Sequence, residues 1–105
     1  MPNLKEKPCL KDYQDYVKEL EFERGFIDQS TRDKCLLLGE EVGELFKAVR
    51  KKQQIKIDKN SKVTTIGEEL ADIFIYLCAI ANRFDINLEE AFRLKEEVNK
   101  KRKWE

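Results

Sequence analysis

Apolar residues recur along most of the chain at the three- and four-residue spacing of α-helices. Ser30, Thr65 and Asn87 each precede an acidic residue by three positions, as in a capping box at a helix N-terminus. Gly25 is placed to end the first helix, and residues 1–9, which contain both prolines, are expected to form a loose leader. Four helices are therefore predicted, at about residues 10–24, 30–52, 65–84 and 87–104.

The third predicted helix is apolar almost all round. A helix without a polar face must be buried on both sides, and a 105-residue chain has little material to cover both. We therefore expect one side to face the chain's own core and the other to form a subunit interface. The expected core stripe is Ile66, Leu70, Ile73, Leu77 and Ile80, and the expected interface side is Ala71, Phe74, Ile75 and Cys78.

Residues 53–64 break the helical period and are polar and rich in lysine. This segment connects the second and third predicted helices. Its composition is compatible with a solvated connector, with a short hairpin or extra turn, and with a mobile flap near bound phosphates.

Two pairs of carboxylates border the apolar stripes of the second and third helices. Glu41 and Glu44 lie three residues apart, as do Glu69 and Asp72, so each pair projects from one face of its helix. Glu40 points further out. A pair of this kind is most often a hydrated helix face, but a second pair at the matching angle on the next helix favours a shared site.

Four carboxylates at the margin of a core are costly unless something positive lies between them, because repulsion and lost hydration both disfavour their ionised forms. The chain contains no histidine. Hard oxygen ligands without histidine suit Mg²⁺ or Mn²⁺ rather than Zn²⁺, and Mg²⁺ held by carboxylates keeps positions open for substrate phosphates. The sequence therefore predicts a magnesium site that acts on phosphates.

Composition narrows the remaining classes of function. The absence of histidine excludes His-dependent catalytic triads, and the balance of 21 basic against 21 acidic residues implies no strong affinity for nucleic acid. The chain has neither an apolar run of membrane-spanning length nor a signal-peptide core, so a single cytoplasmic domain spanning residues 1–105, without a membrane partner, is expected. Cys9, Cys35 and Cys78 are widely spaced and are expected to be free thiols.

The acidic pattern also resembles that of a known family. The run Glu40-Glu41-x-x-Glu44, the later run Glu69-x-x-Asp72 and the tail Lys95-x-x-x-Asn99-x-x-Arg102 are similar to those of MazG-like all-α nucleoside triphosphate pyrophosphohydrolases, including integron MazG proteins and dCTP pyrophosphatases. The similarity covers roughly residues 10–104. It implies a four-helix unit that assembles as a homodimer or as a dimer of dimers.

The resemblance implies Mg²⁺-dependent hydrolysis of a (deoxy)nucleoside triphosphate to the monophosphate and pyrophosphate, with Mn²⁺ as a possible substitute. By analogy it implies a house-cleaning role, the removal of non-standard nucleotides. Glu41 or Glu44 would accept a proton from the attacking water, and Glu40 would orient a water or another group that contacts a metal ligand. The residues carried over are Glu41, Glu44, Glu69 and Asp72 as metal ligands, Glu40, Glu41 and Glu44 as catalytic residues, and Lys95, Asn99 and Arg102 as phosphate-binding residues.

The base preference is open, because members of such a family differ in the nucleotide they accept. Tyr76, Asn82 and Trp104 are candidates to stack on or hydrogen-bond a nucleobase, with core or interface packing as the alternative. Lys95 and Arg102 have an alternative interpretation as solvated helix charges, and Asn99 as a surface residue.

Two other functions remain in competition. One is a related enzyme resembling the phosphoribosyl-ATP pyrophosphohydrolase of histidine synthesis. The other is a catalytically silent helical dimer that acts as a binding or regulatory module. Carboxylates at all four positions argue against the silent module, because four charges beside a core are costly and an inactive site would not require them.

Overall fold

The computed structural model describes residues 1–53 and 64–102. Within them the chain forms four α-helices and one short 3₁₀ helix, and these residues include no strand. The all-α fold class is therefore confirmed, whereas the interior of the predicted 53–64 connector lies outside the described residues. The elements are α1 (Leu10–Glu23), η1 (Phe26–Asp28), α2 (Thr31–Lys52), α3 (Ile66–Arg83) and α4 (Leu88–Lys100).

The helix boundaries follow from the predicted caps. Ser30, Thr65 and Asn87 each accept a hydrogen bond through a side-chain oxygen from the backbone N–H three residues on, at 3.0, 3.1 and 3.0 Å. Gly25 has a φ of 74°, a left-handed conformation that turns the chain out of α1 into η1. The last helix is shorter than predicted: α4 ends at Lys100, so Lys101 and Arg102 follow it, and residues 103–105 lie outside the described part of the chain.

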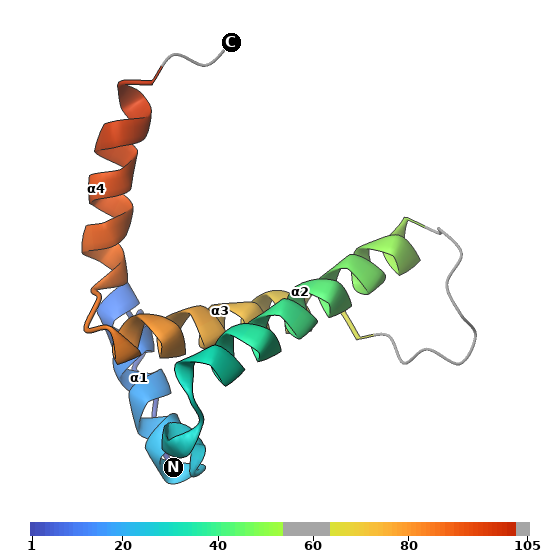
Figure 1. Cartoon of the computed structure of the whole chain (residues 1–105), viewed down its shortest axis with the longest axis horizontal. Coiled ribbons are helices and arrows are strands. Elements are labelled where there is room, and N and C mark those ends of the chain that lie inside the picture. The colour runs from blue at the N-terminus through green and yellow to red at the C-terminus, as the bar shows by residue number, and fades with distance from the viewer. Residues whose placement is uncertain (54–63, 103–105) are drawn as a thin grey trace.

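The helices form a bent arrangement rather than a closed bundle (Figure 1). The most extensive contact is between α2 and α3, which lie side by side, and α1 packs across α3 near one end of this pair. The remaining helix, α4, contacts α1 and projects away from the α2–α3 pair. One chain therefore leaves a large concave side uncovered between α3 and α4.

The core lies where α1 crosses α3. Its buried members are Val17 and Leu20 from α1 and Cys78 and Ala79 from α3. Cys78 is fully buried, and burial raises the pKa of its thiol to about 11. All three cysteines are free. Partly buried residues complete the cluster: Tyr13, Tyr16, Phe74, Ile75 and Leu88.

The predicted roles of the two apolar sides of α3 are wrong. Phe74 and Ile75, expected at a subunit interface, pack on the core, and the Phe74 ring meets Tyr13 edge-on at 5.4 Å. Leu70 and Leu77, from the expected core stripe, are 53% and 44% exposed. The periodicity gives two apolar sides and cannot say which one α1 will cover. Because α1 packs on the Phe74 side, the leucine side is left open.

No helix in the described ranges combines the length and the apolar character needed to cross a lipid bilayer.

Candidate metal centre

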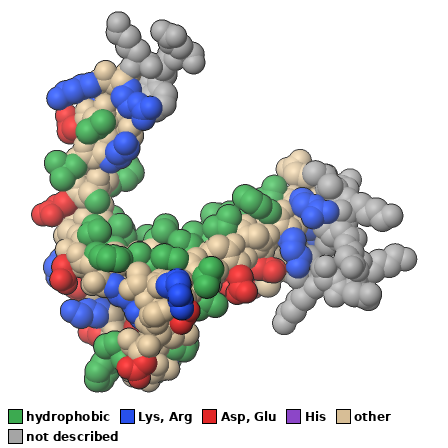
Figure 2. Space-filling view, in the orientation of Figure 1, with side chains coloured by type: hydrophobic (Ala, Val, Ile, Leu, Met, Phe, Trp, Pro, Cys, Tyr) green, Lys and Arg blue, Asp and Glu red, His purple; other side chains and the backbone are tan. Residues whose placement is uncertain are grey.

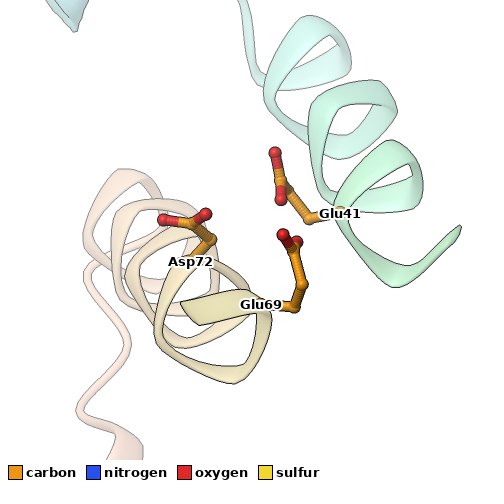
Figure 3. Close-up of side chains that lie close together, drawn as sticks. All are labelled: Glu41, Glu69 and Asp72. Carbon is orange, nitrogen blue, oxygen red and sulfur yellow. The ribbon is translucent and has the colours of Figure 1, made fainter. Parts of the chain in front are cut away.

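Three of the four predicted metal ligands converge between α2 and α3. Glu41 projects from α2 toward Glu69 and Asp72 on α3 (Figure 3). One carboxylate oxygen from each of the three lies within 4.8 Å of the others. Glu69 is buried, Glu41 is half-buried and Asp72 is exposed. We call these three residues the acidic trio.

The three carboxylates of the trio repel one another, and this repulsion disfavours their ionised forms. A hydrogen bond with Glu69, partial burial and the neighbouring negative charges raise the pKa of Glu41 to about 7. Burial and the charges of Glu69 and Glu68 raise the pKa of Asp72. Hydrogen bonds from the Thr64 hydroxyl and from Glu41 lower the pKa of Glu69. Glu41 therefore keeps a proton, shared with Glu69, to a higher pH than an isolated glutamate does.

The donors fit a divalent cation. The Thr64 hydroxyl donates to Oε1 of Glu69, whereas Oε2 is buried and has no hydrogen-bond partner among the described residues. A buried carboxylate oxygen without a partner is costly. A cation between the trio would satisfy that oxygen and remove the need for the shared proton. Three carboxylates without nitrogen or sulfur ligands are the donor set of Mg²⁺ or Mn²⁺.

The fourth predicted ligand lies beside the trio rather than in it. Glu44 is partly exposed and forms an ion pair with Lys47, with its Oε1 3.6 Å from the lysine Nζ. Its charge contributes to the raised pKa of Glu41, so it lies within electrostatic reach of the trio. Glu40 is exposed on α2. A role for either residue in catalysis stays a prediction.

The predicted phosphate-binding residues are not brought to the trio within one chain. Lys95 and Asn99 lie on α4 and Arg102 follows its end, and α4 projects away from the α2–α3 pair that holds the trio (Figure 1). The side-chain amide of Asn99 donates to Glu96 at 2.9 Å. Sequence spacing could not reveal this separation, because it depends on the angle between α3 and α4.

The three nucleobase candidates have different surroundings. Tyr76 lines a cavity of about 160 Å³ together with Asp72 of the trio. Asn82 is hydrogen-bonded to Gln14, with which it exchanges bonds of 3.1 and 2.9 Å that tie α3 to α1. Trp104 lies outside the described residues. Of the two candidates that the structure describes, Tyr76 is the one that lies beside the trio.

Sequence reasoning missed a buried ion cluster next to the trio. Lys34 on α2 and Arg83 on α3 both contact Oε2 of Glu21 on α1, at 2.9 and 3.2 Å. Lys34 is only 3% exposed. The signal in the sequence was that Lys34 lies four residues before Leu38, on the apolar stripe of its helix, where an ordinary solvated lysine would not lie.

The family model of the MazG nucleotide pyrophosphohydrolase domain matches residues 29–104. The chain belongs to the MazG family. The MazG match covers α2, α3 and α4 and so includes the whole acidic trio, whereas α1 lies outside it. The resemblance predicted from the sequence is therefore confirmed.

Two solved MazG structures are similar to the chain along most of its length. Both are crystal structures of iMazG from Vibrio DAT 722, one with a C-terminal tag and one with an N-terminal tag. Each is 32% identical and has a TM-score of 0.63 over 89% of this chain, covering 99% and 95% of the respective iMazG chains. No curated protein sequence gave a significant match.

Proposed function

We propose that the chain hydrolyses nucleoside triphosphates, including deoxynucleotides, to the monophosphate and pyrophosphate in a reaction that requires a divalent cation. The observation that carries the proposal is the convergence of Glu41, Glu69 and Asp72. One oxygen of this group, Oε2 of Glu69, is buried and has no hydrogen-bond partner in the part of the chain that the structure describes. The match of residues 29–104 to a nucleotide pyrophosphohydrolase domain supports the same reaction. Removal of non-standard nucleotides is the cellular role that such an activity would serve.

The acidic trio would hold Mg²⁺, with Mn²⁺ as a substitute, and Glu44 would join as a fourth ligand or remain nearby as a base. When bound, the cation supplies positive charge that acidifies coordinated water and offsets the charge on phosphate oxygens. Glu44, beside the trio, or Glu41 within it would accept a proton from the attacking water. The water oxygen bonds to the α-phosphorus, and the α–β bridging bond breaks to release pyrophosphate with its electron pair.

The proposal includes self-association. A cavity of about 620 Å³ between α1, α3 and α4 is lined by apolar side chains such as Leu77, Ile80 and Phe92. Figure 2 shows hydrophobic side chains along the side of the α2–α3 arm that faces α4. An exposed apolar surface of this kind is typical of an interface. A second copy that covers this surface would also bring its own Lys95, Asn99 and Arg102 toward phosphates bound at the trio of the first copy.

The decisive experiment is a panel of nucleotides incubated with the wild-type chain and Mg²⁺, with pyrophosphate and monophosphate measured separately. We expect equimolar pyrophosphate and monophosphate, and no turnover when the cation is chelated. Asp72→Asn should remove activity, whereas Glu19→Gln, the equivalent amide substitution on the exposed face of α1, should retain it.

The competing functions give different results in the same panel. Phosphoribosyl-ATP as the preferred substrate would assign the chain to the related pyrophosphohydrolase. Nucleotide binding without any pyrophosphate release would support the silent regulatory module and refute the proposal.

A further inference from the structure

The buried ion cluster places two cations, Lys34 and Arg83, on one carboxylate, that of Glu21. Arg83 is committed to the fold, because it donates to Glu21, to the Phe26 carbonyl oxygen at 3.0 Å and to the Gln29 carbonyl oxygen. Lys34 has a different environment. Its ammonium contacts one acceptor, Glu21, and otherwise lies over two aromatic rings, 4.9 Å from the Phe26 centroid and 5.5 Å from the Tyr76 centroid.

Lys34 and Glu21 both line the cavity that Tyr76 shares with Asp72 of the acidic trio. Its volume of about 160 Å³ is well below the roughly 300–1,000 Å³ of pockets that enclose a whole ligand. It corresponds to about five water molecules at roughly 30 Å³ each. The cavity is therefore suited to one flat ring, with the rest of a bound molecule extending toward Asp72.

The polar groups that line the cavity can bond to the edge of such a ring, and its aromatic side chains can stack on the faces. An ammonium group has three N–H donors and no acceptor, and the described contacts of Lys34 give it one carboxylate oxygen. Both contacts of Glu21 fall on the same oxygen, Oε2. The rings of Phe26 and Tyr76 supply surfaces for stacking. A ring that carries a carbonyl oxygen would thus accept a hydrogen bond from Lys34, which Glu21 holds in place.

We propose that this cavity receives the nucleobase and that Lys34, with Glu21, selects a pyrimidine through its ring carbonyl. The inference rests on the proposed function. Cytosine, uracil and thymine all present a carbonyl at C2, which accepts from an ammonium. Adenine has no carbonyl, and guanine carries its carbonyl on a fused pair of rings that is larger than the single ring the cavity suits. A single six-membered ring is also closer to the size of the cavity than a fused pair of rings is. Lys34 is then a specificity-determining residue and takes no part in the chemical step.

The test compares kcat/KM for dCTP, dTTP, dATP and dGTP in the wild type and in Lys34→Met. Loss of a hydrogen bond from a charged donor should lower kcat/KM for the two pyrimidine nucleotides by about 10- to 100-fold. The values for the two purine nucleotides, dATP and dGTP, should change by less than about threefold, so the ratio of pyrimidine to purine kcat/KM should fall. Lys51→Met, at an exposed position on α2, is the matched control and should leave all four values unchanged.

A second variant covers the case in which Lys34→Met does not fold, because that change leaves Glu21 with one cationic partner. Glu21→Gln combined with Lys34→Met removes both charges and keeps an acceptor for Arg83. An equal loss for all four nucleotides in a folded variant would mean that Lys34 only supports the structure. An unchanged preference would also overturn the inference.

Binding of the product monophosphates separates this inference from the proposed reaction. Calorimetric titration with dCMP and dAMP requires no turnover. Tighter binding of dCMP that Lys34→Met abolishes would support the base site even if no nucleotide were hydrolysed, whereas equal affinities for dCMP and dAMP would refute it in an active enzyme.

Discussion

Glu41→Gln is the substitution whose consequences can be worked out most fully from the structure. It removes one of three converging carboxylates and leaves an amide of the same shape that can still donate to Glu69. Catalysis should be lost, because a cation ligand is lost. The folded chain without metal should nevertheless become more stable at alkaline pH, because a repulsive charge is gone.

The size of this stabilisation follows from the pKa of Glu41, which rises from 4.5 to about 7 on folding. A group with a raised pKa in the folded state contributes stability that is full below pH 4.5 and is lost as the pH rises through about 7. The shift corresponds to at most about 3 kcal/mol. Solvent screening at a half-exposed residue reduces this to about 1–2 kcal/mol.

Thermal unfolding followed by circular dichroism measures this effect, at pH 5.5 and pH 8, first with a chelator and then with Mg²⁺. With the chelator at pH 8, Glu41→Gln should melt about 4–10 °C above the wild type, and at pH 5.5 the difference should shrink. Mg²⁺ should stabilise the wild type at pH 8 and have little effect on the variant. Glu19→Gln serves as the control and should follow the wild type throughout. A variant less stable than the wild type at pH 8 without metal would refute the electrostatic reasoning.

Three further predictions concern the fold and the assembly. Phe74→Ala should lower the free energy of unfolding by about 3–5 kcal/mol, because the ring packs on Tyr13 and the core; urea unfolding monitored by circular dichroism checks this, and a loss below 1 kcal/mol would contradict the assigned core. Leu77→Glu should convert an assembled wild type to monomers that retain the helical spectrum, as measured by light scattering after size-exclusion chromatography; an unchanged mass would place the interface elsewhere. Gly25→Ala should cost about 1 kcal/mol, because its φ of 74° is unfavourable for alanine, and equal stability would show that the turn can relax.

The helices and the acidic trio could be predicted from the sequence because their signals are local. Ser30, Thr65 and Asn87 satisfy backbone donors of their own helices, so their role does not depend on the rest of the fold. Glu41 and Glu69 border apolar stripes, and two helices that pack along those stripes bring them together. Such features need only the helical period and one contact between neighbouring helices.

The features that could not be predicted depend on how distant helices meet. Leu77 and Phe74 are equally apolar, and which of them is covered is decided by the packing of α1. Lys95 lies on a helix whose direction is set by the turn after α3, so its separation from the trio has no counterpart in the spacing. The burial of Lys34 could not be predicted, because it depends on the ion pair with Glu21, a residue thirteen positions earlier on another helix.

Binding of Mn²⁺, followed by the loss of its free electron paramagnetic resonance signal, tests most directly whether the carboxylates between α2 and α3 form a cation site. The wild type should bind Mn²⁺ more tightly at pH 8 than at pH 6, because the proton shared by Glu41 and Glu69 must leave. Mg²⁺ should compete for the site. Asp72→Asn should weaken the binding at least about 100-fold, since even residues that only support metal ligands cost 10- to 100-fold when changed. Wild-type protein that leaves Mn²⁺ free at pH 8, or an Asp72→Asn variant that binds it equally well, would contradict the assignment.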